Sequence, residues 1–470
     1  MSFNSAQFFI FWFVIQFSIL IWNGKALIRN LVLLIGNLVF LYSLGSYQLA
    51  LLVLGFSSMD FFIAQKIHKD SSESIKKILL RFSVVQNIAL ILLFRHFSDW
   101  NLKPEFIDFI KFIGVSFYAF RSMSYVFDVY YETIEVPENS IINYWTYISF
   151  FPIFLMGPIQ TSPSFLKHLH SPSWVINKTQ VNWGAYLISL GIVKKFILSN
   201  YLAVNFVDRI FDSYLYFTPM ENFFAAIIQT LNLYLDFSGY TDIAIGISML
   251  LGFQIIENFN FPFLSQNITE YWKRWHISLS QWFNQYLYFP LSYQMRKWKK
   301  WGTSIAVLIV FIISGVWHGT QLNFLLWGLM HALALIWDIW SSDLRFKLKS
   351  KVSEVIYKPI SIFLTFSFLT FSGIYFKATE IDAANGMIQR IFNGLEFSLF
   401  NDWLNLYPYV ALIFSLSLLI HFTISKFYLR IIETIKKLPV LVSAIMLVVV
   451  IFIAFQFQKM GSVPFYYLEF

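Results

Sequence analysis

The chain has 470 residues, of which 57% are hydrophobic and 13% are charged, and its formal net charge is +8. Because a soluble domain carries about 25% charged residues, this composition excludes a protein with one aqueous core and predicts a polytopic membrane protein. The basic residues lie in short clusters, as in cytoplasmic loops, so no nucleic-acid partner is expected, and the lack of cysteine excludes disulfides and a thiol nucleophile.

Apolar runs predict helices along the whole chain. In chain order they are expected at residues 6–23, 26–44, 47–65, 77–97, 106–128, 141–158, 182–206, 222–236, 239–254, 303–318, 321–340, 356–376, 406–424 and 439–458. Several runs are shorter than the roughly 20 residues that cross a bilayer, so these are interpreted as re-entrant or paired half-helices. We therefore expect an all-α polytopic integral membrane protein with about 11–13 transmembrane helices. Linkers are expected at residues 66–76, 159–180 and 377–405.

Two aspartates interrupt the apolar stretch YLDFSGYTDIAIG, residues 234–246. Asp236 and Asp242 are separated by about 240° around a straight helix. Ser238 and Gly239 predict a break between them, with a carboxylate capping the helix that starts near Gly239. The alternative interpretation is a proton or cation pathway, because ionisable groups inside a membrane are costly and often functional.

The next segment with unusual polarity is SQNITEYWKRWHISLSQWFNQYLYFPL, residues 265–291. Its apolar residues recur at alternating spacings of four and three, which predicts one helix; they are Ile268, Trp272, Trp275, Leu279, Trp282 and Tyr286. A polar stripe beside them consists of Thr269, Lys273, His276, Ser280 and Asn284. We expect an amphipathic helix that lies in the interface or lines a polar cavity. His276 is a candidate for chemistry, and the alternative is a histidine on a solvated polar face.

Two further histidines lie in ISGVWHGTQLNFLLWGLMHALAL, residues 313–335. Basic clusters at 296–300 and 345–351 flank this region, so both flanks are expected on the cytoplasmic side. Residues 303–340 then predict a helical hairpin whose turn is the HGTQ sequence at 318–321. This topology places His318 away from the cytoplasmic surface.

His318 is the strongest candidate for catalysis. A neutral imidazole offers a donor and an acceptor, which suits a general base acting on a hydroxyl, and Gly315 and Gly319 allow close backbone approach. The alternative is a structural histidine that bridges helices. His331 lies about 220° further around a continuous helix, so the two imidazoles need not share a face, and we expect His331 to pack in the protein interior.

Several strings together resemble the membrane-bound O-acyltransferase (MBOAT) family, in particular its bacterial alginate O-acetyltransferase-like branch. The strings are FFPIFLMGPIQ (150–160), DFSGYTDIAIGISMLLGF (236–253), NFNFPFLSQNITEYWKRWHISLSQWFNQYLYFPL (258–291), SGVWHG with LWGLMHA (314–332) and YFKATEIDAA (375–384). The resemblance implies a ring of helices around a thinned centre with a tunnel. It also implies a single membrane domain over residues 1–470, with N-terminal helices at 1–105, a catalytic core at 106–376 and C-terminal helices at 377–470.

What the resemblance implies about function is acyl transfer to a hydroxyl. The family's invariant histidine matches His318, its second histidine matches His276, and His331 matches a recurrent position. The side chains expected to support the tunnel are Trp317, Arg274, Trp275, Lys273, His331, Asp236 and Asp242. No metal and no permanently bound cofactor is expected; the donor would be acetyl-CoA or another acyl thioester from the cytosol.

The implied partners are an extracytoplasmic SGNH-type acyltransferase or similar acceptor protein, a cell-surface polysaccharide or peptidoglycan, and membrane lipids, at the inner membrane of a bacterial cell. Two departures leave the polymer open: Asn284-Gln285 stand where close relatives usually have Arg-Asp, and SYQMRK follows YFPL instead of a Gly-Gly-Asn-Arg loop.

The chain ends in PFYYLEF. Members of the family that acylate cell surfaces tend to end in a similar pattern, matched here by Phe465, Tyr467 and Phe470. Because the chain has no cysteine, Tyr467 is a candidate to carry the acyl group as an ester. The alternative is an aromatic anchor at the membrane interface.

Two rival functions remain at this stage. A related enzyme of the same family could transfer D-alanine to teichoic acid. A proton-coupled transporter would instead use Asp236 and His318 as a proton relay.

Overall fold

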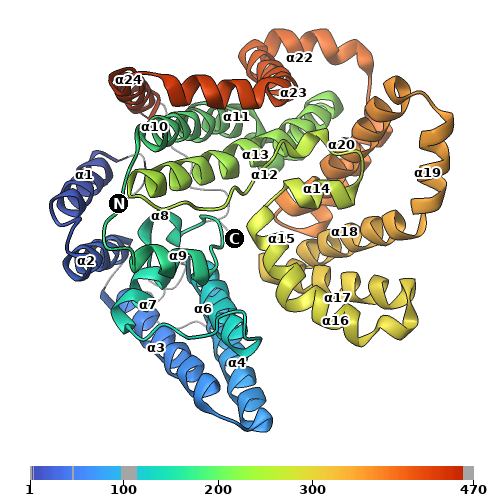
Figure 1. Ribbon diagram of the computed structural model, residues 1–470. Coiled ribbons are helices and arrows are strands. Elements are labelled where there is room, and N and C mark those ends of the chain that lie inside the picture. The colour runs from blue at the N-terminus through green and yellow to red at the C-terminus, as the bar shows by residue number, and fades with distance from the viewer. Residues whose placement is uncertain (1–2, 4, 45–46, 97–113, 459–470) are drawn as a thin grey trace. The chain divides into compact units, whose positions relative to one another are not determined.

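A computed structural model describes residues 3, 5–44, 47–96 and 114–458 (Figure 1). Within these ranges the chain forms helices joined by short connections and contains no strand, so the all-α prediction is confirmed. Tyr467 and the first part of the predicted helix at 106–128 lie outside the described residues.

The helices form two compact units, which are treated separately. The first comprises the described residues of 1–192, 240–257 and 433–455. Its helices are α1 (Ala6–Ile21), α2 (Ala26–Leu44), α3 (Tyr47–Lys69), α4 (Glu73–His96), α6 (Gly114–Tyr130), α7 (Ile141–Ile148), α8 (Phe151–Phe154), α9 (Ser162–Leu169) and α10 (Lys178–Ile192), with the second part of α13 (Pro219–Leu250) and most of α24 (Val440–Gln458).

The second unit comprises the described residues of 193–239, 258–432 and 456–470. It begins with a π-helical segment η2 (Val193–Ser199), α11 (Asn200–Leu202), η3 (Ala203–Val207), α12 (Asp208–Asp212), η4 (Tyr214–Tyr216) and the first part of α13. Next come η5 (Pro262–Leu264), α14 (Ile268–Arg274), α15 (Ile277–Phe283), η6 (Asn284–Tyr288), α16 (Phe289–Gln294) and η7 (Arg296–Trp298). The remaining elements are α17 (Lys300–His318), α18 (Leu322–Trp340), α19 (Ser342–Lys351), α20 (Glu354–Lys377), α21 (Ile381–Gly394), η8 (Phe397–Leu399), α22 (Phe400–Leu406) and α23 (Pro408–Lys437).

Length and hydropathy identify candidate membrane spans among these helices. In the described part of the chain, eight segments are long and apolar enough: 26–44, 47–69, 178–212, 300–318, 322–340, 354–377, 408–437 and 440–457. Their outer faces are rich in exposed apolar side chains, for example Phe363 at 69% and Leu441 at 70%, as expected of residues that contact lipid. The polytopic prediction is therefore confirmed, while the figure of 11–13 crossings stays a prediction.

Most predicted helices agree with the structure to within a few residues, but three predicted segments were wrong. The helix expected at 141–158 is divided into α7 and α8, with Ser149 and Phe150 between them. The linker expected at 159–180 contains α9, and that at 377–405 contains α21 and α22. These helices are short and polar on one face, so they lack the long apolar run on which the prediction relied.

The predicted break at Ser238–Gly239 is also wrong, because α13 continues without interruption from Pro219 to Leu250. Ser238 and Tyr240 are 1% and 0% exposed. A break at this buried position would leave backbone N–H and C=O groups without partners, and a continuous helix satisfies them internally. Asp236 and Asp242 therefore lie inside a helix, and neither caps a helix start.

Asp236 instead forms a buried ion pair with Lys195, and Ser199 donates a further hydrogen bond to the same carboxylate oxygen at 3.4 Å. Lys195 and Ser199 both belong to η2, where the wider π-helical turn replaces the α-helical one. The side chains of Lys195 and Asp236 are 2% and 4% exposed. The pair thus joins η2 to α13 within the second unit.

The first unit buries a carboxylate as well, and the sequence analysis did not select it. Asp60 of α3 is 0% exposed. Its two oxygens accept hydrogen bonds from Ser83, Gln86 and Asn87 of α4 and from Ser122 of α6, at 2.5–2.7 Å. Four neutral donors thus fill the acceptor positions of one carboxylate and tie α3, α4 and α6 together.

We predict that Asp236→Leu destabilises the protein by about 3–5 kcal/mol, because it leaves the Lys195 ammonium buried without its counter-charge. The double variant Lys195→Met/Asp236→Leu should recover most of the lost stability, since it removes both charges. Thermal unfolding of the purified protein in detergent measures both effects. Asp70→Asn is the matched control, because its ion-pair partner Lys66 is 62% exposed and ion pairs with an exposed partner contribute little to stability. Wild-type stability of Asp236→Leu alone would contradict this account.

Candidate active site

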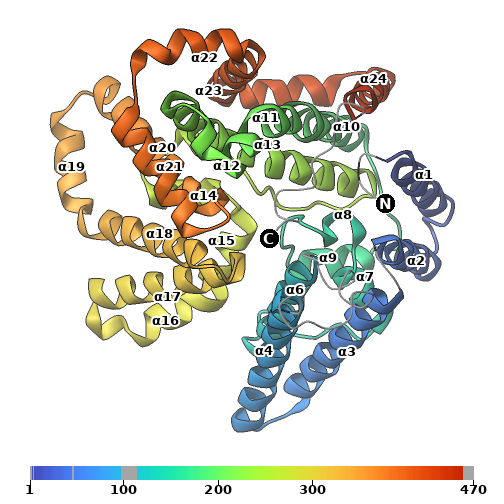
Figure 2. The same cartoon turned by 180° about the vertical axis from the view of Figure 1, so that it is seen from behind.

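The predicted hairpin is confirmed: α17 ends at His318 and α18 begins at Leu322, and the two helices lie side by side (Figures 1 and 2). Glycines permit the close approach. A Cβ atom at Gly315 would lie 2.7 Å from the carbonyl oxygen of Phe324, and one at Gly328 would overlap the carbonyl oxygen of Phe311. A Cβ atom at Gly319 would overlap the ring of Phe324. The backbones therefore pack against each other directly, which fixes the turn that carries His318.

His318 is the last residue of α17 and is 5% exposed. Its ring lies among three aromatic rings, with centroids 4.6 Å from Trp317, 5.0 Å from Trp327 and 5.1 Å from Phe376. Asn323 at the start of α18 donates hydrogen bonds to the carbonyls of Tyr375 and Ala378. The end of α20 is thereby held against the hairpin turn, and the imidazole is held in an apolar surrounding.

His276 lies at a break, so the single helix predicted across residues 268–286 is wrong. α14 ends at Arg274, α15 begins at Ile277, and His276 has a left-handed backbone with φ +43°. The preceding segment stabilises the break: Asn260 N–H donates to the carbonyl of Arg274, and the carbonyl of Asn258 accepts from Ile277 N–H. A left-handed conformation costs a non-glycine residue about 1–2 kcal/mol, and such strained residues often lie at functional sites.

The contacts of His276 define its tautomer. Asn258 Oδ1 accepts hydrogen bonds from Ser278 N–H at 3.1 Å and Ser278 Oγ at 2.9 Å, which identifies it as the amide oxygen. His276 Nδ1 lies 3.2 Å from the same oxygen and therefore carries the proton. Burial lowers the pKa of His276 to about 3, so the ring is neutral at physiological pH and Nε2 has a lone pair. His276 is thus built to accept a hydrogen bond at Nε2.

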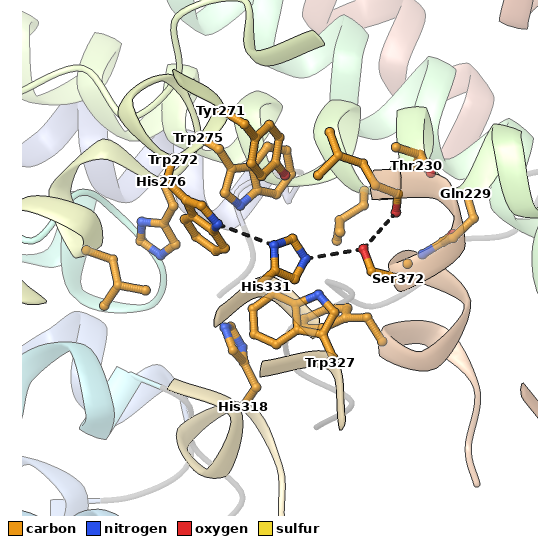
Figure 3. A pocket seen from close by; sticks show the side chains of 15 residues that line it. Gln229, Thr230, Tyr271, Trp272, Trp275, His276, His318, Trp327, His331 and Ser372 are labelled. Carbon is orange, nitrogen blue, oxygen red and sulfur yellow. Dashed lines mark hydrogen bonds between the residues drawn. The ribbon is translucent and has the colours of Figure 1, made fainter. Parts of the chain in front are cut away.

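His331 of α18 has a different set of contacts (Figure 3). Trp272 Nε1, which can only donate, lies 3.3 Å from His331 Nδ1. The neutral ring therefore carries its proton on Nε2, which lies 3.2 Å from Ser372 Oγ. The Ser372 hydroxyl donates in turn to the carbonyl of Leu369 at 3.2 Å. This directed series of hydrogen bonds fixes the orientation of His331 and links α14, α18 and α20.

The three histidines line one cavity of about 40 Å³ inside the second unit (Figure 3). The helical spacing does not require His318 and His331 to share a face, but they line the same cavity. His318 reaches it from the end of α17, and His331 reaches it from the middle of the antiparallel helix α18. The other lining residues are Gln229, Thr230, Leu233, Tyr271, Trp272, Trp275, Leu279, Trp327, Leu369, Ser372, Gly373 and Phe376. None of these fifteen residues is acidic or permanently charged, so the three histidines and the phenol of Tyr271 are the acid–base groups of this lining.

Larger hollows adjoin this cavity. Trp272 and Leu279 also line a cavity of about 390 Å³ between α14, α15 and the α17–α18 hairpin. Thr269 and Lys273 line that cavity and a third hollow of about 420 Å³, whose wall includes Arg345. The small histidine cavity therefore adjoins wider space, whose lining includes the basic side chains Lys273 and Arg345 and the carboxylates Glu270 and Asp338.

The remaining predicted site residues have separate positions. Trp275 lines the histidine cavity, and Trp317 packs on His318. Arg274 lies outside the cavity lining and pairs with Glu270 at 2.9 Å. Asp236, which is paired with Lys195, is also absent from the lining, and Asp242 lies in the part of α13 that belongs to the first unit. Asp236 and His318 therefore form no relay in the described cavity.

Sequence reasoning missed several residues of this site. Ser372, Trp327 and Asn258 lie in apolar runs and match no catalytic spacing, so only the hydrogen bonds and ring contacts of the folded chain identify them. Lys195 had one local signal, since a lysine pair within an apolar run is costly unless a counter-charge is near.

Comparisons with known proteins identify the family of the chain. A model of the membrane-bound O-acyltransferase family matches residues 3–376. A peptidoglycan O-acetyltransferase of Helicobacter pylori is 26% identical over 378 residues, which cover 73% of this chain and 70% of that protein. A probable alginate O-acetylase AlgI of Pseudomonas aeruginosa is 28% identical over 403 residues, covering 83% and 74%.

A teichoic acid D-alanyltransferase of Bacillus subtilis is 27% identical over 281 residues, which cover 57% of this chain and 70% of that protein. The family model spans well over half of the chain and includes all three histidines of the cavity. The resemblance seen in the sequence motifs is confirmed: the chain belongs to the membrane-bound O-acyltransferase family and is an O-acyltransferase.

Proposed function

We propose that this protein transfers an acetyl group from a cytosolic acyl thioester, across the bacterial inner membrane, to a hydroxyl of a cell-surface polysaccharide or peptidoglycan. The observation that carries the proposal is the convergence of His318, His276 and His331 on one small uncharged cavity. Relatives named peptidoglycan O-acetyltransferase and alginate O-acetylase support the acetyl group and the glycan acceptor.

In this proposal His318 is the general base. It takes the proton from the acceptor hydroxyl while the oxygen attacks the thioester carbonyl, and a C–O bond forms. The tetrahedral intermediate collapses with cleavage of the C–S bond, and the proton held by His318 passes to the leaving thiolate. The products are an ester and a free thiol. A neutral imidazole suits both halves of this exchange.

The tautomers of His276 and His331 indicate different roles for these two histidines. His276 holds its proton on Nδ1 and accepts at Nε2, so it orients a donor group of the substrate; stabilising an oxyanion would require an N–H at this position. His331 carries its proton on Nε2 toward Ser372 and acts as a positioning residue for the cavity wall. His276 is therefore not an oxyanion donor in this mechanism.

The adjoining hollows support a route for the thioester donor. Acetyl-CoA and similar donors are long, flexible and phosphorylated at one end. The cavity of about 390 Å³ beside Trp272 and Leu279 has room for the arm of such a molecule. Lys273 further along offers a cation for its phosphate groups, whereas Arg345 is paired with Asp338.

The size and charge of the histidine cavity favour acetyl over D-alanyl transfer. A site for one water needs about 10–15 Å³ of such space, so about 40 Å³ has room for a small group such as acetyl. A D-alanyl group is larger and carries an ammonium group, and none of the lining residues supplies a carboxylate for it.

The proposal includes an extracytoplasmic acyltransferase of the SGNH type that completes delivery to the glycan. Tyr467 near the C-terminus is the proposed carrier that presents the acyl group to it as an ester.

We predict that His318→Ala lowers acetyl transfer at least 100-fold, because loss of a general base typically removes a factor of about 10²–10⁴. The measurement is the ester-linked acetyl content of cell-surface glycan in cells that carry the variant, at matched membrane levels. His421→Ala is the control, since His421 is also buried but does not line the cavity. Unchanged acetylation in His318→Ala would refute the assignment of the base.

We predict that Tyr467→Phe abolishes transfer to the glycan while the protein still forms and inserts normally, because the carrier oxygen is missing. Wild-type protein should yield an acetylated C-terminal peptide in mass spectrometry, and hydroxylamine should remove the group. Tyr466→Phe, the neighbouring tyrosine, should behave as wild type. Full glycan acetylation by Tyr467→Phe would eliminate the carrier role and leave the histidine mechanism intact.

A further inference from the structure

The wall of the histidine cavity formed by α20 lacks a side chain at one position. Gly373 of α20 lies in the lining, between Ser372, which contacts His331, and the end of the helix near His318. A Cβ atom built on Gly373 would have a single neighbouring atom within 4 Å, Thr230 Oγ1 at 3.7 Å. The space beside this glycine is therefore open, unlike the tightly packed glycines of the α17–α18 hairpin.

Leu369 lies one helical turn before Gly373 on the same face of α20. It also lines the cavity and is 5% exposed. The two positions therefore form adjacent parts of one wall, one filled by a branched side chain and one left empty. The carbonyl of Leu369 accepts the hydrogen bond from Ser372, so this wall is fixed relative to His331.

We propose that Gly373 determines which acyl group the enzyme transfers: the space left by its missing side chain holds the methyl end of an acetyl group, and Leu369 closes that space to longer acyl chains. This inference rests on the proposed function. The site takes a short, uncharged, unbranched acyl group, because the wall around Gly373 consists of apolar, hydroxyl and amide side chains.

The cavity is small, about 40 Å³. Gly373→Ala places one further carbon atom in its lining, at a position where a Cβ atom meets only Thr230 Oγ1. Leu369→Ala removes three carbon atoms from the adjacent wall, which makes room for a longer acyl chain.

The test compares acyl donors on the full-length protein in membranes or detergent. Acetyl, propionyl and butyryl thioesters are supplied, and kcat/KM is measured for each with wild type, Gly373→Ala and Leu369→Ala. Wild type should strongly prefer acetyl. Gly373→Ala should lower acetyl transfer at least tenfold, and Leu369→Ala should raise the butyryl-to-acetyl ratio at least tenfold.

Gly55→Ala is the matched control, because Gly55 lies within α3 and a Cβ atom there would meet nothing within 4 Å. Alanine at either helical glycine favours helix formation, so a loss confined to Gly373→Ala reports on the cavity. Thermal unfolding of each variant verifies folding.

Three results would overturn the inference. Wild-type acyl preference in both cavity variants refutes the role of Gly373 and leaves the acetyltransferase function standing. The same conclusion follows if Gly55→Ala loses acetyl transfer as much as Gly373→Ala. No acyl transfer by wild type from any of the three donors refutes the proposed function together with the inference.

Discussion

The site depends on the direct backbone contact between α17 and α18. Gly315, Gly319 and Gly328 lie where any side chain would collide with the facing helix or with the ring of Phe324. Within an apolar membrane interior, helix association relies on such close packing, because burial from lipid gives little hydrophobic gain. The contact sets the turn at His318, brings His331 beside Trp327, and gives α20 a rigid surface on which to place Ser372 and Gly373.

Polar groups inside this apolar chain are held by partners from other helices. Asp236 pairs with Lys195, Asp60 accepts from four neutral donors, and His331 lies between Trp272 and Ser372. An unsatisfied polar group in a low-dielectric interior is costly, so each of these contacts also fixes which helices are neighbours. The hydrogen-bond partners of His276 and His331 also define their tautomers, because they determine which ring nitrogen carries the proton.

The small histidine cavity and the wider cavity beside it suit different parts of a substrate. The small space between the histidines admits a few atoms, and the wider space beside Trp272 and Leu279 admits a long substrate arm. In the proposed mechanism, a narrow reaction space beside a wide approach keeps bulk water away from the reacting carbonyl and strengthens the electrostatic interactions there. In the proposed selectivity, the fit of the acyl group depends on the wall that contains Gly373.

The sequence by itself determined the membrane class, nearly all long helices, the hairpin that ends at His318, and, through its motifs, the acyltransferase family. Apolar periodicity, glycine placement and basic flanks are local properties, so a single chain reveals them. The tertiary structure alone decided that α13 is unbroken, that the helix at 268–286 breaks at His276, and that His331 shares the cavity of His318. Each of these depends on residues distant in sequence. The burial of α13 keeps it continuous, the backbone of residues 258–260 stabilises the break at His276, and the Trp272 and Ser372 side chains orient His331.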